Sequence, residues 1–188
     1  STINAPALAR RAEAAGIRMI TVHGRTRCQF YTGAADWSAV RAVKQSVGVP
    51  VVVNGDIRSF DDALNALDAS GADAVMVGRA AQGRPWFAGQ AARFLATGER
   101  EQAPSLAEQA SLIATLYDEM IAHHGERIGR RHARKHLGWA LDCAAESAGV
   151  APEVLKQHRV RVLTAEQPGV AQRHLADAYD DFAWRAAA

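Results

Sequence analysis

Val49-Pro-Val-Val-Val-Asn-Gly-Asp-Ile57 is the stretch that decides the fold class, because a continuous β-branched run ends there in a polar turn. Two runs of the same kind flank it, Arg18-Met-Ile-Thr-Val22 and Asp73-Ala-Val-Met-Val77. Continuous apolar strands separated by helical segments imply a parallel sheet that is covered on its outer face. The strand ends recur roughly every 30 residues, which is the period of β-α-β units.

Helices are predicted around these strands from capping residues and from the spacing of apolar residues. The first covers Pro6 to Ala15, the second starts after Asp36, and the third starts at Ser59, with Asp62 as its capping partner. The apolar residues expected to be buried in the second and third helices are Trp37, Val40, Val43, Val47, Ala63, Leu64 and Leu67. This alternation fits either a (β/α)8 barrel or a doubly wound sheet, so the placement of polar residues has to separate the two.

After Gly98 the pattern changes to helices only. A capping box formed by Ser105 and Glu108 starts a helix that ends near Gly125, and further helices follow over residues 128–147 and near the C-terminus. Their inward positions are expected to be Leu112, Ile113, Leu116, Tyr117, Met120, Ile121, Ala171, Leu175, Ala178 and Phe182. We therefore predict an α/β domain over residues 1–98 and a helical domain over residues 99–188.

The composition is that of an ordinary globular chain of 188 residues, 48% of them apolar and 22% charged. No apolar run has the length of a membrane span and the N-terminus lacks a signal-peptide pattern, so a cytoplasmic location is expected, with no membrane partner. Cys28 and Cys143 lie far apart without CxxC spacing, which predicts neither a disulfide framework nor a zinc site. His132 and His136 stand four apart, but they lack the HExxH pattern, so no metal is expected.

Each predicted strand ends in a polar turn that contains glycine: His23-Gly-Arg-Thr26, Asn54-Gly-Asp-Ile57 and Gly78-Arg-Ala-Ala81. In a parallel barrel these turns share the C-terminal face, where active sites are built. Glycine allows close approach to a ligand, and N–H groups at a helix start bind phosphate, especially beside an arginine such as Arg79. One such turn is more often a tight connection only. Three in succession favour a phosphate site whose ligand the spacing does not identify.

Three motifs that contain these turns resemble the tRNA-dihydrouridine synthase family, in its bacterial B-type branch. They are His23-Gly-Arg-Thr-Arg-Cys-Gln-Phe-Tyr-Thr-Gly-Ala-Ala-Asp-Trp37, Pro50-Val-Val-Val-Asn-Gly-Asp-Ile57 and Gly71-Ala-Asp-Ala-Val-Met-Val-Gly-Arg-Ala-Ala-Gln-Gly-Arg-Pro-Trp86. A fourth, Arg134-Lys-His-Leu-Gly-Trp139, resembles the RKHxxW motif of that family's helical domain. The resemblance covers nearly the whole chain, and it implies the last three β-α units of a TIM (β/α)8 barrel followed by an all-α domain.

The resemblance also implies FMN as the cofactor and NADPH as its reductant. His23 is then expected to contact the flavin, Asn54, Gly55 and Asp56 its ribityl-phosphate arm, and Gly78 with Arg79 its phosphate. Hydride passes to a uridine of the tRNA D-loop, while a cysteine supplies the proton. The residues expected to line the entrance for a flipped uridine are Arg25, Arg27, Gln29 and Tyr31, although a solvated loop explains them about as well.

The partner implied for the helical domain is tRNA. Basic residues between His123 and His136 fall near one helical face, where they are expected to contact phosphates. They are Arg127, Arg131, Arg134 and Lys135, with Arg130 in an adjacent row.

The family carries its catalytic cysteine on an earlier strand, and three strands cannot close an eight-stranded barrel. We therefore expect that the N-terminal half of the barrel is missing and that this chain alone is inactive. Neither Cys28 nor Cys143 is expected to replace that cysteine. Two alternatives stay open: an RNA-binding fragment without activity, and a barrel enzyme that acts on a small molecule and binds FMN or another phosphate.

Overall fold

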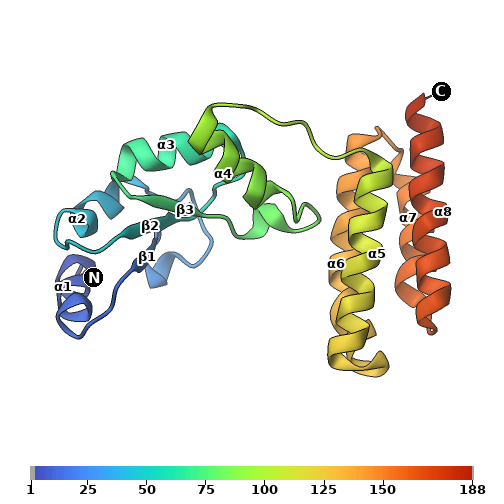
Figure 1. Ribbon diagram of the computed structural model, residues 1–188, viewed down its shortest axis with the longest axis horizontal. Coiled ribbons are helices and arrows are strands. Elements are labelled where there is room, and N and C mark those ends of the chain that lie inside the picture. The colour runs from blue at the N-terminus through green and yellow to red at the C-terminus, as the bar shows by residue number, and fades with distance from the viewer. Residues whose placement is uncertain (1–2, 188) are drawn as a thin grey trace. The chain divides into compact units, whose positions relative to one another are not determined.

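The computed structural model describes residues 3–187, and the chain divides into two compact units. The first unit comprises Ser1–Ala81 and Trp86–Glu101, and the second comprises Gln82–Pro85 and Gln102–Ala188. The segment Gln82–Pro85 thus packs with the helical unit, although the residues on both sides of it belong to the first unit. In Figure 1 the α/β unit runs from blue to green and the helical unit from yellow-green to red.

The first unit is built on a parallel three-stranded sheet in the order β1-β2-β3. The strands are β1 (Ile20–His23), β2 (Val51–Asn54) and β3 (Ala74–Met76). All three predicted strands are therefore present, and the fold class is α/β as expected. His23 and Asn54 are the last residues of their strands rather than the first residues of the following turns, because both still pair with the neighbouring strand.

Helices cover one face of this sheet (Figure 1). Their bounds are α1 (Ala5–Ala14), α2 (Arg41–Lys44), α3 (Phe60–Ser70) and α4 (Phe87–Thr97). The row Val22, Val53 and Val75 lies in register across the strands and belongs to a core to which α3 and α4 contribute. The opposite face carries the row His23, Asn54 and Met76, so the alternation of side chains along each strand separates core from site.

Three details of the predicted helices were wrong. The helix expected after Asp36 begins as a 3₁₀ turn, Ser38–Val40, and the α-helical part ends at Lys44, before Val47. Leu64 is exposed, because Ala63 and Ala66 occupy the face of α3 that packs on the sheet. Leu112, which was expected to face inward in the helical unit, is exposed as well, because other residues of its helix occupy the buried face.

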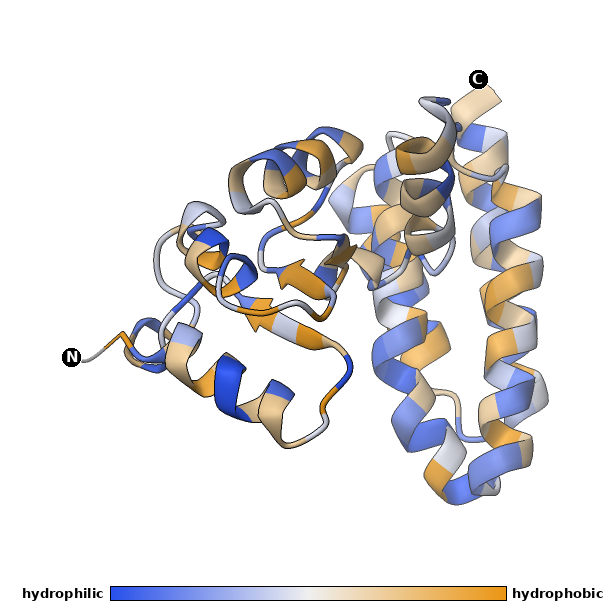
Figure 2. Ribbon diagram, turned by 60° about the vertical axis from the view of Figure 1, so that its left-hand side comes forward, coloured by the Kyte–Doolittle hydropathy of each residue, from blue (hydrophilic) through white to orange (hydrophobic). Residues whose placement is uncertain are grey.

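Four helices form the second unit: α5 (Leu106–His124), α6 (Glu126–Ser147), α7 (Pro152–Thr164) and α8 (Pro168–Ala187). Hydropathy colouring shows apolar and polar residues alternating along them, as expected for helices that each bury one face (Figure 2). The core includes Ile113, Leu141, Leu175 and Phe182, all fully buried. Within residues 3–187, none of the helices combines the length and apolarity needed to cross a membrane.

Candidate functional site

The C-terminal ends of β1 and β2 bring His23 and Asn54 together. His23 Nδ1 lies 2.6 Å from Asn54 Oδ1, and Asn54 Nδ2 donates to the carbonyl oxygen of Met76 at 2.8 Å. Because the amide nitrogen is committed to Met76, the amide oxygen must accept from His23, so Nδ1 carries the proton. In the neutral imidazole Nε2 is then the acceptor, and it is the ring atom left to a ligand or solvent.

Gly55 is the position at which this pair meets the loop that follows β1. Its φ of 122° is one that other residues rarely adopt, and a Cβ there would lie 2.8 Å from Ala35 Cβ and 3.2 Å from His23 Cε1. The carbonyl of Gly55 accepts a hydrogen bond of 2.7 Å from Trp37 Nε1. Glycine is therefore required by both backbone and space, and it packs against the imidazole ring.

Asp56 gathers three arginines at the same edge of the sheet. Its carboxylate pairs with Arg25, lies 3.2 Å from Arg79 Nη2 and 3.6 Å from Arg58 Nη2, and accepts the Ala35 N–H at 2.9 Å. The hydrogen bond from Arg25, together with the Ala35 N–H and the charge of Arg58, holds the pKa of Asp56 below its usual value despite the opposing effect of burial. Three guanidinium groups around one carboxylate leave a surplus of positive charge, as a phosphate site requires.

Asp56 also has a positive φ of 53°, which is uncommon for any residue except glycine. Two successive residues with positive φ, Gly55 and Asp56, turn the chain sharply directly after β2. The contacts of Gly55 and the ion pairs of Asp56 offset the cost of this conformation.

The buried side chain of Arg25 stabilises the loop that follows β1. Its side chain is only 2% exposed, and besides Asp56 its guanidinium donates to the carbonyl oxygen of Gly33 at 2.7 Å. Gly24 closes the base of the same loop, since its carbonyl accepts from Asp36 N at 2.7 Å and a Cβ on Gly24 would lie 2.9 Å from the Asp36 carbonyl oxygen. The loop is thus fixed to the sheet at both ends, and Arg25 faces the protein rather than an incoming base.

The other predicted loop residues lie farther out. Arg27 is exposed, while the Gln29 side chain accepts from Thr26 N at 2.7 Å in the capping box of a 3₁₀ turn, Arg27–Gln29. Tyr31 is exposed, and the Arg79 guanidinium lies over its ring, 4.8 Å from the centroid. Tyr31 therefore joins the loop to the turn that follows β3, a contact that a solvated loop does not predict.

The turn after β3 supplies Gly78 and Arg79. A Cβ added to Gly78 would have no neighbouring atom within 4 Å, so the space beside this glycine is open. The N–H of Ala81 donates to the Gly78 carbonyl oxygen at 3.0 Å. Arg79 is exposed and begins a 3₁₀ turn, Arg79–Ala81. A pocket of about 530 Å³ opens nearby in the same unit. It is lined by Gly33, Ala34, Ala35, Trp37, Asp56, Arg58 and Asp62.

The predicted basic residues of α6 form one exposed surface, here called the cationic face: Arg127, Arg131, Arg134 and Lys135. Gly129 and Ala133, on the opposite side of the same helical turns, are buried against the core, so the cationic face points outward. Arg130 is not part of it. Its guanidinium donates to the carbonyl oxygen of Glu166, so at least one of its N–H groups is engaged within the helical unit.

Histidine rings lie beside the cationic face. His124 stacks on His132 with centroids 5.0 Å apart, and His123 meets His124 edge-on at 4.5 Å. His136 meets Trp139 edge-on at 5.3 Å, and burial holds the pKa of His136 below its usual value. Within residues 3–187, no cluster of three or more His, Cys, Asp or Glu side chains is placed to hold a metal ion.

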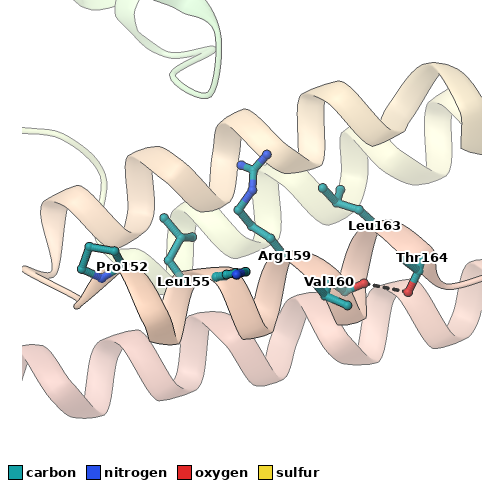
Figure 3. Close-up of a pocket in the computed structure, with 7 residues that line it drawn as sticks. Pro152, Leu155, Arg159, Val160, Leu163 and Thr164 are labelled. Carbon is teal, nitrogen blue, oxygen red and sulfur yellow. Dashed lines mark hydrogen bonds between the residues drawn. The ribbon is translucent and has the colours of Figure 1, made fainter.

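A separate apolar groove of about 410 Å³ lies along α7 (Figure 3). Leu155, Val160 and Leu163 line it, and Arg159 crosses from α7 to the Gly138 carbonyl of α6 at 2.8 Å. None of its lining residues belongs to the predicted site, so the groove takes no part in the arrangement at the strand ends.

Sequence reasoning missed several residues of the site. Arg58 was overlooked because one arginine two positions after an acidic residue is a common surface pattern. Trp37 was read as a buried helix residue, yet its indole fixes Gly55. Phe30, exposed with a positive φ of 47°, stands beside Tyr31 at the tip of the loop, and only the aromatic pair in sequence signals it.

Comparison with known proteins identifies the family of the chain. The family profile described as dihydrouridine synthase (Dus) matches residues 1–168. The chain is 53% identical over 139 residues to the "Probable tRNA-dihydrouridine synthase" of Rickettsia conorii, which covers 74% of this chain and 42% of the relative. It is 44% identical over 180 residues to the protein of that name from Rhizobium leguminosarum bv. phaseoli, covering 96% and 53%.

A third relative, "tRNA-dihydrouridine synthase B" of Xanthomonas axonopodis pv. citri, is 49% identical over 145 residues, covering 77% of this chain and 44% of the relative. The chain spans about half the length of the curated relatives it matches.

Proposed function

Because this chain belongs to the dihydrouridine synthase family, we propose that it forms part of an enzyme that reduces uridine in tRNA to 5,6-dihydrouridine. The observation that carries the proposal is the arginine cluster around Asp56 beside the His23–Asn54 pair, at the ends of parallel strands in a chain of this family. The proposed architecture is the last three β-α units of a TIM barrel over residues 1–98, followed by a tRNA-binding helical domain over residues 99–188.

The proposed cofactor is FMN, and the residues at the strand ends fit it in two respects. Arg79 and Arg58 are exposed cations that converge on Asp56, and guanidinium groups placed side by side suit a phosphate dianion. Gly78 leaves open space beside Arg79, as a backbone that approaches a phosphate requires. Asn54, Gly55 and Asp56 would flank the ribityl-phosphate arm, and His23 Nε2 would face the flavin as an acceptor.

Bound FMN, with NADPH as its reductant, would supply a hydride to the uracil ring, and a separate proton donor would complete the saturation of the double bond. The residues of this chain bind and orient rather than react. Arg25 and Asp56 hold the loop after β1 closed, so that Arg27 and Tyr31 stand at a fixed position for the uridine. The cationic face of α6 would bind tRNA phosphates, and the uridine has to leave its stack to reach the flavin. D-loop uridines are the proposed substrates, and the proton donor is proposed to lie outside this chain.

The full-length protein tests the proposal when it is produced in a strain that lacks its own dihydrouridine synthases. We expect a yellow protein with bound FMN that restores NADPH-dependent dihydrouridine in D-loop positions of tRNA. Arg79→Ala should release FMN and abolish the product, whereas Arg10→Ala, which removes an exposed arginine from α1, should do neither. A colourless wild-type protein that still binds tRNA would favour an RNA-binding role instead.

The tRNA surface has its own test in the salt dependence of binding. Removing Arg131 and Lys135 together should weaken tRNA binding and lower the slope of log K against log salt by roughly one per lost phosphate contact. Arg173→Ala, on an exposed part of α8, is the control and should leave the slope unchanged. Equal slopes for all three proteins would contradict the assignment of the cationic face.

A further inference from the structure

Phe30 occupies a position in the loop after β1 that its backbone conformation does not favour. With a φ of 47° and a ψ of −109°, it follows Gln29 in a tight turn that is closed by a hydrogen bond of 2.9 Å from Thr32 N to the Gln29 carbonyl oxygen. These angles are typical of the first central position of a type II′ turn, where glycine is preferred. For a residue as bulky as phenylalanine, a positive φ is a genuine outlier.

The packing of the Phe30 side chain does not offset this strain. Phe30 is 74% exposed, so burial of the ring contributes little to the stability of the loop. Strained backbone conformations persist where the surrounding structure fixes them, and they cluster at ligand sites. The combination of strain and exposure therefore points to a role for the ring outside the folded loop.

Hydrogen bonds of the neighbouring residues hold the ring at a fixed place. The Gln29 side chain accepts from Thr26 N at 2.7 Å, and the Gln29 carbonyl oxygen also accepts from Thr32 Oγ1 at 2.7 Å. The N–H of Phe30 itself donates to the Arg27 carbonyl oxygen at 3.4 Å. The tip of the loop is therefore preorganised, which favours binding because less freedom is lost when a ligand arrives.

The surroundings of Phe30 have the chemistry of a nucleotide site. Arg27 is exposed on the preceding 3₁₀ turn, and Tyr31, which is 70% exposed, has the Arg79 guanidinium 4.8 Å from its ring centroid. Aromatic rings interleaved with cations suit a nucleic-acid strand, because its bases stack on the rings while its phosphates pair with the cations. An apolar protein surface would leave the arginines without a counter-charge.

We propose that Phe30 stacks on a base of the tRNA that flanks the uridine to be reduced. The inference rests on the proposed function, since it takes the RNA to be the substrate. A uridine that leaves its stack to reach the active site deprives its neighbours of a stacking partner, and an exposed aromatic ring can replace that partner. Phe30 would thus bind the substrate beside the reacting base and would take no part in holding the flavin.

Three substitutions of Phe30 in the full-length protein separate stacking from strain. Phe30→Gly removes the ring and suits the turn, so the dissociation constant of tRNA should rise about tenfold or more, the effect of one lost base stack, with FMN affinity and thermal stability retained. Phe30→Leu keeps an apolar side chain without a flat ring and should lose similar affinity. Phe30→Trp should bind tRNA as the wild type does.

Salt dependence and a control aromatic sharpen the comparison. Stacking releases no counterions, so the slope of log K against log salt should be unchanged in Phe30→Gly, unlike the slope after removal of Arg131 and Lys135. Trp184→Ala is the matched control, because Trp184 is 67% exposed beside Arg185 but belongs to the regular helix α8. Its tRNA affinity should equal that of the wild type.

A tRNA that lacks one base identifies the stacking partner. Each of the two positions that flank the modified uridine is made abasic in turn, and binding to wild type and Phe30→Gly is compared. At one of these positions the two proteins should bind equally, because the contact that Phe30→Gly removes is already absent. A difference between the proteins that persists at both positions would contradict the proposal.

The remaining outcomes separate this inference from the function on which it rests. Wild-type protein that neither binds tRNA nor forms dihydrouridine overturns the proposed function itself. With an active wild type, unchanged tRNA affinity in Phe30→Gly and Phe30→Leu overturns the inference, as does a Phe30→Trp variant that binds as weakly as Phe30→Gly. Loss of thermal stability and of FMN affinity in both Phe30→Gly and Phe30→Leu would also overturn it, because the ring would then pack inside the full-length enzyme.

Discussion

Replacing Asp56 with asparagine tests whether the buried Arg25 pair fixes the loop after β1. The substitution keeps the size of the side chain and one oxygen that can accept from Ala35 N, but it removes the negative charge. Arg25, 2% exposed, would then hold a buried charge with no carboxylate to neutralise it, supported by carbonyl oxygens of the loop and by a neutral amide oxygen in place of the carboxylate oxygen that it shares with Ala35 N. We expect the loop to open far more often, because an unpaired buried cation is costly.

The size of the effect follows from burial. Breaking a buried ion pair from one side costs about 3–5 kcal/mol, and the lower end applies here because asparagine retains an acceptor. About 3 kcal/mol corresponds to a roughly 100-fold change in an equilibrium constant. If the loop opens locally, its amides should exchange with solvent about 100-fold faster.

Asp73 offers a closely matched control. Its carboxylate also accepts one backbone N–H, from Val51 at 2.7 Å, and it pairs with Lys44 at 2.7 Å, whereas Asp56 pairs with the buried Arg25 and with two exposed arginines. The difference is exposure, since the side chains of Asp73 and Lys44 are 43% and 28% exposed, against 14% and 2% for Asp56 and Arg25. A surface pair contributes at most about 1 kcal/mol, so Asp73→Asn should accelerate local exchange no more than about fivefold.

Hydrogen exchange followed by mass spectrometry of the full-length protein makes the comparison. Peptides covering residues 24–36 report on the loop, and those covering residues 44–54 and 71–76 report on the control pair. Similar acceleration in the two variants, each at its own contact, would refute the reasoning that burial of Arg25 makes its pair decisive. So would normal protection of the loop in Asp56→Asn.

Three further predictions concern acid, a cysteine and an arginine. The pKa of Asp56 is lower in the folded state than the unfolded value of about 3.9. The ionised carboxylate therefore stabilises the folded loop fully above that value, and this stabilisation is lost as the pH falls through the folded pKa. Protection of the loop amides from exchange should drop in acid below about pH 4, and Asp56→Asn should lack this drop. Cys28 is exposed, and Cys28→Ser in the full-length enzyme should leave dihydrouridine formation within about twofold of wild type, whereas a loss of orders of magnitude would make it catalytic. Arg130→Ala should lower the thermal stability of the helical unit, because it removes the hydrogen bond to the Glu166 carbonyl. Unlike Arg131→Ala, it should leave the slope of log K against log salt for tRNA binding unchanged.

Local signals in the sequence were sufficient where one short segment decides the structure. The capping boxes Ser59–Asp62 and Ser105–Glu108 start α3 and α5 as predicted, because both partners lie within one turn. The run Val51–Val53 forms the central strand, since β-branched residues without polar interruption fit a buried strand with a neighbour on each side. The His23–Asn54 contact follows from the same logic, as parallel strands bring their carboxyl ends to one edge.

What the sequence did not predict depends on contacts between distant segments. Leu64 is more apolar than Ala66, yet alanine occupies the sheet-facing side because α3 packs closely there. Arg25 was predicted to line the entrance for an RNA base. The spacing of residues in the sequence does not show that its loop folds back onto Asp56. Gly83 packs closely against α6, more than 50 positions later in the chain. A glycine in a turn gave no sign of that contact.

A carboxylate at the centre of a proposed phosphate site needs an explanation, because alone it would repel a dianion. Arg25, Arg58 and Arg79 would also repel one another if they converged without a counter-charge, and Arg25 is buried and cannot be screened by water. Asp56 offsets both costs before any ligand arrives, while Arg58 and Arg79 stay exposed on its outer oxygen. Asp56→Asn, which makes the site more positive, should therefore bind FMN more weakly. Tighter binding would show that net charge outweighs the ordering of the arginines.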